Sequence, residues 1–448
     1  MHTDIIIIGA GPGGYETAVH AAKRGLSVTL FEANKVGGTC LNEGCIPTKA
    51  FCKNADVVEA LKEADVYGIQ GLSYSLDFAR VIERKNQVVS TLAAGIETLL
   101  KHKLITYVHA KADFVDAHTV TTDGQTYTAD HIIIATGSVS KLLPIPGVTL
   151  PGVVTSKELL DIDHVPSRLC IIGAGVIGME FASVFSRMGS QVTVVEFMKE
   201  ILPNFDTDIA KRLKQTLGKR GIEIVNQAKV CSIEQTGGGL AVNYEYKEKQ
   251  LRCEADTVLM AVGRAANVGA LNLAAAGIEF TPRGIAVNDH MQTNVPHIYA
   301  IGDVNARCML AHAATFQGLR ALNHIQGLTD DIRFDLIPAA VFTSPEAAMV
   351  GLSEEQCKAQ GLNITVKKSF FRANGKALAM NEPDGYCKLL VNADDDRVVG
   401  CHLFGAHAAD LVQEVCALMN RDVTLTQFAQ IIHGHPTLGE VVQNAVMS

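Results

Sequence analysis

The stretch DIIIIGAGPGG, residues 4–14, decides how the first part of this chain folds. Four consecutive isoleucines predict a buried parallel strand, and the glycine-rich run after them predicts a tight turn into a helix. Gly9, Gly11 and Gly14 let a pyrophosphate approach the helix N-terminus, whose free N–H groups and dipole favour negative charge. The next strand, LSVTLFE, ends at Glu32, 23 residues beyond Gly9, where a carboxylate is suited to hold an adenosine ribose.

The same pattern of strand, glycine turn and helix recurs in LCIIGAGVIGMEFASVF, residues 169–185. Gly173, Gly175 and Gly178 follow an apolar strand, and the next strand, VTVVE, ends at Glu196, again 23 residues beyond the first glycine. One such motif is weak evidence, but two with correctly placed acids predict two dinucleotide-binding βαβ units. A carboxylate at this position accepts from a ribose 2′-hydroxyl and repels a 2′-phosphate, so Glu196 favours NAD over NADP.

A pair of cysteines follows the first unit, in GGTCLNEGCIPTKA, residues 37–50. A straight helix would separate Cys40 and Cys45 by about 7.5 Å along its axis, farther than the Cα separation of most disulfides. A bridge therefore needs a bent or newly starting helix, which Gly44 and Pro47 permit. A bridge across so short a loop adds little stability, so redox exchange explains the pair better. Two buried cysteines that never touch remain the alternative.

Two nucleotide folds beside a dithiol predict an electron path from nicotinamide through a flavin to a disulfide. The cysteines lie close behind the second strand of the first unit. We therefore expect FAD in the first unit and NAD in the second.

Composition sets the broad class of the protein. The 448 residues are 48% hydrophobic and 19% charged, which suits two to four globular domains. A formal net charge of −8 gives no basic surface, so neither a nucleic-acid partner nor membrane association is expected. No signal peptide or membrane-spanning run is recognised, and a cytoplasmic location is expected. The eleven scattered cysteines lack the paired spacing of zinc ligands, so no metal site is expected.

Further motifs extend along the chain: IIIATGS (132–138), VPHIYAIGDV (295–304), MLAHAA (309–314), FTSPEAAMVGLSE (342–354) and HGHPTLGE (433–440). With the cysteine segment, they resemble the pyridine nucleotide-disulfide oxidoreductases nearly end to end, and within that family the dihydrolipoyl dehydrogenases. The resemblance implies an α/β fold with two Rossmann-like dinucleotide-binding domains, for FAD and NAD, and a C-terminal α+β dimerisation domain. It also implies a homodimer.

The resemblance implies roles for individual residues of the redox segment. Cys40 is expected to exchange with the substrate dithiol, and Cys45 to face the flavin as a thiolate in a charge-transfer contact. Lys49 is expected near flavin N5, paired with Glu180, because a buried cation needs an anionic partner. Glu43 stands where many relatives have valine, and its charge is expected to shift the thiol potentials.

The C-terminal motif implies a histidine base. His435, oriented by Glu440, is expected to reach the dithiol of the opposite subunit, since a carboxylate fixes the tautomer and raises basicity. His433 lies two residues earlier, and the pattern HPTxxE selects His435 instead. Without the cysteines, a surface His–Pro turn would be the simpler explanation.

The expected cofactor-binding residues lie in both units and in a later segment. Asp303 is expected to hydrogen-bond the ribitol, and MLAHAA to lie at the pyrimidine edge of the flavin. The residues expected at FAD are Gly9, Gly11, Gly14, Glu32, Lys49, Ala112, Thr136, Gly137, Ser138, Asp303, Met309, Leu310, Ala311 and His312. The residues expected at NAD are Gly173, Gly175, Gly178, Glu180, Glu196, Val230 and Gly263.

The motifs also predict the domain boundaries. Residues 1–147 are expected to form the FAD domain and residues 148–264 the NAD domain. Residues 265–335 should return to complete the FAD domain, and residues 336–448, with alternating apolar residues, should form the interface domain.

The predicted reaction is oxidation of protein-bound dihydrolipoamide by NAD+. The expected partners are a second copy of the chain and either a lipoylated acyltransferase of a 2-oxo acid dehydrogenase complex or the glycine-cleavage carrier protein. A glutathione-reductase-like or mercuric-reductase-like enzyme is the alternative within the family. A subunit that only assembles a complex is the alternative outside catalysis, and the retained cysteines, lysine and histidine argue against it.

Overall fold

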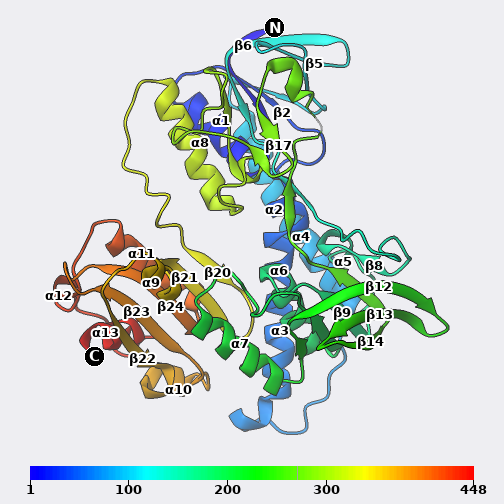
Figure 1. The fold of residues 1–448 in the computed structure, drawn as a ribbon, viewed down its shortest axis with the longest axis vertical. Helices are drawn as coiled ribbons and strands as arrows, with labels where there is room; N and C mark the ends of the chain where they lie inside the picture. The colour runs from blue at the N-terminus through cyan, green and yellow to red at the C-terminus, as the bar shows by residue number, and fades with distance from the viewer. Residues whose placement is uncertain (270) are drawn as a thin grey trace.

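The computed structural model describes residues 1–269 and 271–448, which form three packed units (Figure 1). Two units are built on mainly parallel sheets and the third on an antiparallel sheet with helices against it. The predicted α/β class with two Rossmann-like units and a C-terminal α+β unit is therefore confirmed. In the described part of the chain, no helix combines the length and the apolar character that crossing a membrane requires.

The first unit has a sheet in the order β3-β2-β1-β6-β5-β4, with β19 also paired to β6. Ile5 and Ile7 of β1 pack with residues of α1, α4 and α8, whereas Ile6 and Ile8 pack on the opposite side. Both faces are covered, which is why four isoleucines stand in a row. The elements are β1 (His2–Ile8), α1 (Pro12–Lys23), β2 (Val28–Phe31), α2 (Gly38–Glu43), α3 (Cys45–Lys62), α4 (Phe78–Leu100), β3 (Ile105–Val108), β4 (Asp113–Phe114), β5 (Thr119–Thr122) and β6 (Gln125–Ile134).

The second unit has a parallel sheet in the order β11-β10-β9-β15-β8, and beside it an antiparallel sheet in the order β12-β13-β14. The elements are β7 (Ser138–Ser140), β8 (Val153–Val154), α5 (Ser156–Leu159), β9 (Arg168–Ile172), α6 (Val176–Met188), β10 (Gln191–Val195), α7 (Thr207–Lys219), β11 (Glu223–Val225), β12 (Ala228–Thr236), β13 (Gly239–Tyr246), β14 (Lys249–Ala255) and β15 (Thr257–Met260).

After β15 the chain returns to the first unit. Strand β16 (Arg264–Ala266) pairs with β7 in a separate two-stranded sheet, and β19 (Ile298–Ala300) then joins the sheet of the first unit, in parallel with β6. Between them lies the hairpin of β17 (Phe280–Thr281) and β18 (Gly284–Ile285), and after them comes α8 (Ala311–Ile325). Helix α8 packs closely on α1, because a Cβ added at Gly318 would lie 1.8 Å from the Thr17 hydroxyl.

The third unit has an antiparallel sheet in the order β20-β21-β24-β23-β22, with α11 packed on β21 and β24 and α13 on β22 and β23. Its elements are β20 (Ala339–Val341), β21 (Glu346–Gly351), α9 (Glu354–Ala359), β22 (Ile364–Phe370), α10 (Gly375–Ala379), β23 (Tyr386–Asn392), β24 (Val398–Gly405), α11 (Ala408–Met419), α12 (Leu425–Phe428) and α13 (Glu440–Met447).

Helix α3 connects the units. It belongs to the first unit in sequence, yet it packs against α6 of the second unit as well as against α4 (Figure 1). The residues after the cysteine pair are therefore held between the two parallel-sheet units.

Candidate active site

One cavity of about 2560 Å³ joins the two glycine-rich loops and the cysteine pair. It is lined by residues from all three units, including most of the residues singled out from the sequence. Those lining it are Gly9, Gly11, Glu32, Cys40, Cys45, Lys49, Ala112, Thr136, Gly137, Ser138, Gly173, Gly175, Glu180, Glu196, Val230, Gly263, Asp303, Met309, Leu310, Ala311 and His312. Gly14 and Gly178 lie behind the loops, and His435 and Glu440 lie elsewhere on the chain.

The first glycine loop is shaped by close backbone contacts. Gly9 has φ +106°, and a Cβ there would lie 2.4 Å from the Ala135 carbonyl oxygen. A Cβ at Gly14 would lie 1.8 Å from the carbonyl oxygen of Gly9, so only glycine lets α1 start against β1. The N-cap of α1, Gly11, has no side-chain hydrogen bond, which leaves the first N–H groups free for an anion.

Glu32 supports this loop. Its Oε2 accepts a hydrogen bond of 2.7 Å from the Ala10 N–H, and its Oε1 accepts one of 2.8 Å from the Asn34 N–H. Each carboxylate oxygen has a second lone pair, so the same side chain can also accept from ribose hydroxyls.

The second loop repeats this geometry. Glu196 Oε2 accepts from the Ala174 N–H at 2.5 Å, and Oε1 accepts from the Met198 N–H at 2.6 Å. The side chain that follows Glu196 is Phe197, which is 70% exposed at the edge of the cavity. The residues directly after Glu196 are Phe197, Met198, Lys199 and Glu200. None of these four is an arginine that could bind a 2′-phosphate.

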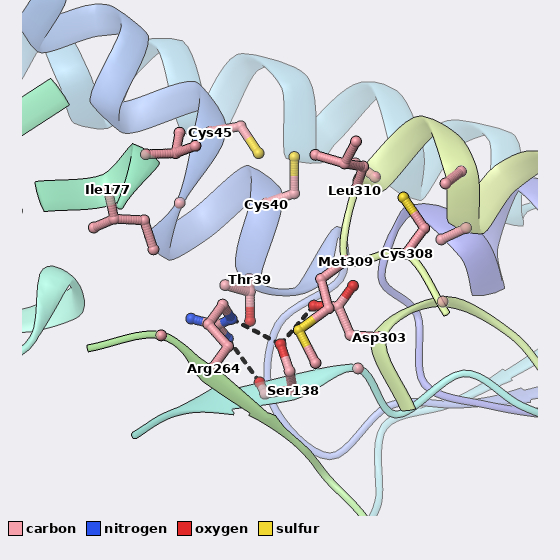
Figure 2. A pocket seen from close by; sticks show the side chains of 18 of the residues that line it. Thr39, Cys40, Cys45, Ser138, Ile177, Arg264, Asp303, Cys308, Met309 and Leu310 are labelled. Carbon is pink, nitrogen blue, oxygen red and sulfur yellow. Dashed lines mark hydrogen bonds between the residues drawn. The ribbon is translucent and has the colours of Figure 1, made fainter. Parts of the chain in front are cut away.

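The cysteine segment forms two helices with a break between them. Helix α2 ends at Glu43, Gly44 has φ −146° and ψ −113°, and α3 begins at Cys45. A Cβ at Gly44 would lie 2.9 Å from the Thr39 carbonyl oxygen, so the break requires glycine. The break turns Cys40 and Cys45 toward each other, with both sulfurs free and pointing into the same space (Figure 2). The predicted interruption of the helix is confirmed.

The two thiols differ in acidity. A hydrogen bond from Cys40, helped by the nearby Lys49 ammonium, lowers the pKa of Cys45 to about 7. Donating that hydrogen bond, together with burial, raises the pKa of Cys40. When the two thiols lose their first proton, the negative charge is therefore on Cys45.

Lys49 and Glu180 form an ion pair between α3 and α6. Lys49 Nζ lies 2.9 Å from Glu180 Oε1 and 3.0 Å from Oε2. The Glu180 side chain is only 4% exposed, whereas that of Lys49 is 32% exposed. Burial alone would lower the pKa of Lys49, but the Glu180 carboxylate outweighs it and the pKa is raised. The lysine is thus held as a cation beside Cys45.

A hydrogen-bonded chain lies below the cysteines and contains a residue that the sequence had not indicated. Arg264 Nε donates to Ser138 Oγ at 2.7 Å, and Ser138 Oγ donates to Asp303 Oδ2 at 2.5 Å (Figure 2). Arg264 Nη2 also donates to the Ser138 carbonyl at 2.7 Å. In the sequence, Arg264 served only as a domain boundary; its position beside Gly263 was the available signal.

The start of α8 forms another wall of the cavity. Met309 and Leu310 precede the helix, and its N-cap, Leu310, offers no side-chain hydrogen bond to the first N–H groups. His312 Nε2 lies 2.9 Å from the Pro338 carbonyl oxygen and links this helix to the third unit. Uncapped N–H groups here favour an electron-rich edge of a bound molecule.

The C-terminal histidines have different surroundings. His435 is 79% exposed, and its Nδ1 lies 2.9 Å from Glu440 Oε1. The hydrogen bond with His435 lowers the pKa of Glu440, which keeps it a carboxylate. His433 is 7% exposed, and its Nε2 lies 2.8 Å from Glu414 Oε1. Only His435 presents an open Nε2, although the structure does not bring it to the cysteines of its own chain.

No group of three or more histidine, cysteine, aspartate or glutamate side chains is placed to hold a metal ion within residues 1–269 and 271–448.

Comparisons with known proteins agree with this geometry. Residues 3–318 match a model of the pyridine nucleotide-disulphide oxidoreductases, and residues 337–446 match the dimerisation domain of that family. The chain is 37% identical to a dihydrolipoyl dehydrogenase of Bacillus subtilis over 99% of its length and 98% of the relative's. It is 39% identical to one of Mycobacterium bovis over 99% and 97%. A solved structure of the HOCl-induced flavoprotein disulfide reductase RclA from Escherichia coli is similar with a TM-score of 0.89, at 30% identity and 99% coverage of both chains.

Proposed function

The chain belongs to the pyridine nucleotide-disulphide oxidoreductase family, and we propose that it oxidises protein-bound dihydrolipoamide to lipoamide with NAD+. The observation that carries this proposal is the Cys40–Cys45 pair inside one cavity that also contains both glycine loops. Whole-length relatives called dihydrolipoyl dehydrogenase support lipoamide as the substrate.

The enzyme uses FAD and NAD, and we assign FAD to the first loop and NAD to the second. A Cβ at Gly38, where α2 begins, would lie 2.7 Å from Gly11 Cα, so the redox segment rests directly on the first loop. The uncapped helix N-termini and the loop-bound Glu32 and Glu196 fit two dinucleotides. When bound, these cofactors accept the electron pair that the substrate leaves on Cys45 and carry it away as hydride.

The first chemical step is attack on the oxidised cysteine pair. His435 of the partner subunit takes the proton of one substrate thiol, and the resulting thiolate attacks Cys40 Sγ. The bond between Cys40 and Cys45 breaks, and its electron pair leaves on Cys45. The Lys49 cation stabilises negative charge on Cys45 and so makes this sulfur the better leaving group.

The second step resolves the mixed disulfide. The other substrate thiol attacks the substrate sulfur bound to Cys40, lipoamide leaves with a closed disulfide, and the proton of that thiol stays with Cys40. The enzyme then holds two electrons as a Cys40 thiol and a Cys45 thiolate, and one proton on His435.

The dimerisation domain supports a homodimer, in which we propose that each active site is completed by the His435–Glu440 pair of the other subunit. The exposed ring of His435 and its distance from the cavity of its own chain favour this arrangement. The domain boundaries at residues 147, 264 and 335, a lipoylated acyltransferase or glycine-cleavage carrier as partner, and the cytoplasmic location stay predictions.

An assay of dihydrolipoamide oxidation coupled to NAD+ reduction tests the proposed function. Cys45→Ser should abolish turnover while the flavin stays bound, because its hydroxyl cannot leave or carry the electron pair. Cys231→Ser, a substitution in β12 outside the cavity, is the matched control and should keep full activity. A Cys45→Ser protein with normal turnover would exclude the mechanism.

The alternative within the family is a glutathione-reductase-like or mercuric-reductase-like enzyme. Steady-state preference between the two nicotinamide cofactors separates these activities, because Glu196 favours NADH. A strong preference for NADPH, with oxidised glutathione as the better substrate, would support the alternative.

A further inference from the structure

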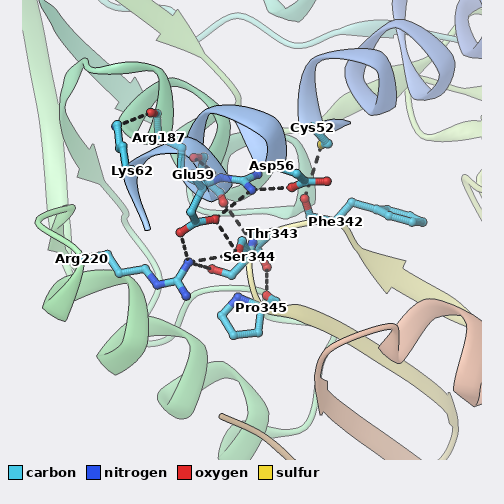
Figure 3. A network of polar contacts seen from close by, with 11 residues as sticks. Cys52, Asp56, Glu59, Lys62, Arg187, Arg220, Phe342, Thr343, Ser344 and Pro345 are labelled. Atoms are coloured by element: carbon cyan, nitrogen blue, oxygen red, sulfur yellow. Dashed lines mark hydrogen bonds and ion pairs between the residues drawn. The ribbon is translucent and has the colours of Figure 1, made fainter. Parts of the chain in front are cut away.

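The motif FTSPEAAMVGLSE has no role in the mechanism above, yet its first residues lie at the catalytic ion pair. Residues 342–345 connect β20 and β21 of the third unit and run beside α3 and α6 (Figure 3). The loop thus brings a third unit to a contact already formed by the first two.

Phe342 contacts both members of the Lys49–Glu180 pair. Its backbone N–H donates a hydrogen bond of 2.9 Å to Glu180 Oε1, the same oxygen that Lys49 Nζ approaches at 2.9 Å. Its ring lies under the ammonium, with Lys49 Nζ 4.4 Å from the ring centroid. The Phe342 carbonyl accepts a hydrogen bond of 3.4 Å from Cys52 Sγ, one turn after Lys49 on α3.

The loop is anchored two residues farther on. The Ser344 N–H donates to Ser183 Oγ at 3.0 Å, and Ser344 Oγ donates to Glu59 Oε2 at 3.1 Å. Arg220 Nη1 donates to Glu59 Oε1 at 2.8 Å and to the Ser344 carbonyl at 3.0 Å (Figure 3). Contacts to α3, α6 and the end of α7 therefore fix where Phe342 can lie.

Arg187 strengthens the same junction. Its side chain is buried, and Nη1 lies 2.5 Å from Asp56 Oδ1 and 3.3 Å from Glu59 Oε2 (Figure 3). Helices α3 and α6 are thus held together by charged pairs at both ends of their contact, at Lys49–Glu180 and at Arg187. The loop spans the distance between the two pairs.

The ring has a physical effect on Lys49. An ammonium over an aromatic face is attracted by the ring quadrupole, and the ring also limits access of water and the number of rotamers. The charged and titratable groups that face Lys49 are Glu180 from α6 and Cys45 and Cys52 from α3. A lysine that moved away would stabilise the Cys45 thiolate less.

We propose that Phe342 is a positioning residue, contributed by the dimerisation unit, that holds Lys49 and Glu180 in place beside Cys45. This inference rests on the proposed function, in which Cys45 carries the electron pair. The Lys49–Glu180 ion pair is then a contact among all three units. A change in the position of the third unit would therefore change the environment of Cys45.

Phe342→Leu tests this inference in the flavin-loaded, reduced protein. The readout is the pH dependence of alkylation of Cys45 by iodoacetamide, followed by peptide mass spectrometry. Phe342→Leu should raise the apparent pKa of Cys45 by about half a unit, with less thiolate at neutral pH. Phe342→Tyr keeps an aromatic face and should restore the wild-type profile.

Phe370→Leu is the matched control. The Phe370 ring also lies near a cation, with Arg372 Cζ 4.7 Å from its centroid, but at the far end of β22. It should leave the Cys45 profile unchanged. An unchanged profile in Phe342→Leu, or an equal shift in Phe370→Leu, would overturn the inference.

A second variant covers the case in which Phe342→Leu loses its flavin or does not fold. Phe342→Met, which fills a similar volume without a ring, is then measured in its place and must show the same shift in the pKa of Cys45. The alkylation readout needs no substrate. A wild-type protein that fails to oxidise dihydrolipoamide rejects the proposed function, whereas a missing pKa shift rejects the role of Phe342.

Discussion

The loops after β1 and after β9 have nearly the same shape but serve different neighbours. Gly9 and Gly173 share φ +106°, and a Cβ on them would lie 2.4 Å and 2.5 Å from the carbonyl oxygens of Ala135 and Ala261. At Gly14 and Gly178 the corresponding distances to the preceding loop are 1.8 Å and 2.0 Å. The two glycine loops therefore have nearly the same backbone geometry.

The helices that follow these loops differ. Glu16 and Glu180 occupy the same position, two residues after the third glycine. Helix α1 packs on α8, and Glu16 is half-buried with no ion pair among the described residues. Helix α6 packs on the redox helix α3, and Glu180 is buried against Lys49. The two loops are alike, and the helix packed beside each one decides whether its glutamate lies next to the redox helix.

The largest effect is expected at the third glycines. Gly14→Ala should lower the amount of bound flavin by about tenfold or more, because its Cβ would overlap the Gly9 carbonyl. Gly178→Ala should leave the flavin bound and weaken NADH binding by a similar factor. Flavin absorbance per protein and an NADH titration check both. The reversed pattern would place FAD in the second unit.

The next effect separates the two glutamates. Glu180→Gln should lower turnover by roughly tenfold, which corresponds to about 1.4 kcal/mol of barrier, since Lys49 loses its anionic partner. Glu16→Gln is the matched change in the first unit and should alter turnover by less than about twofold. Steady-state rates with dihydrolipoamide provide the measurement. Equal losses in the two variants would mean that the helices do not differ in the way described.

A smaller effect concerns thiols in the two units. The second unit has its own thiol pair, in which a hydrogen bond from Cys170 lowers the pKa of Cys253 to about 7. Lys49→Met should raise the pKa of Cys45 by about one unit and leave that of Cys253 unchanged, because Lys49 acts on Cys45 and not on Cys253. Thiolate is present above the pKa, so alkylation of Cys45 should begin at higher pH in the variant. Residue-resolved alkylation across pH follows both thiols, and a parallel shift at Cys253 would contradict the assignment.

The smallest effect is expected at Glu43. Its Oε1 lies 2.7 Å from Lys157 Nζ of α5, so its charge is paired across the two units rather than free to act on the thiols. Glu43→Val should shift the potential of the cysteine pair by less than about 20 mV. Potentiometry of the variant against the wild type measures this. A shift of about 60 mV would restore the expectation that Glu43 tunes the thiols by its charge.

The sequence was most informative at positions where close backbone contacts allow only one type of residue. The glycine turns and the helix break at Gly44 depend on local sterics, and they occur at the predicted positions. The covered isoleucines of β1 likewise predicted a parallel strand with both faces buried.

What the sequence could not provide were the contacts between distant segments. Arg264 and Phe342 reach the site only because β16 pairs with β7 and because the β20–β21 connection lies beside α6. The burial of His433 likewise depends on packing against Phe428 and Glu414. None of these neighbours is close in sequence to the residue that it orients.

An anaerobic single turnover of the flavin-loaded protein tests the electron path through the cysteine pair. Dihydrolipoamide is added without NAD+, the excess is removed, and NAD+ is then supplied. We expect one NADH per bound flavin in the wild type and none in Cys45→Ser. NADH formed equally by the Cys45→Ser protein would contradict an electron path through the Cys40–Cys45 pair.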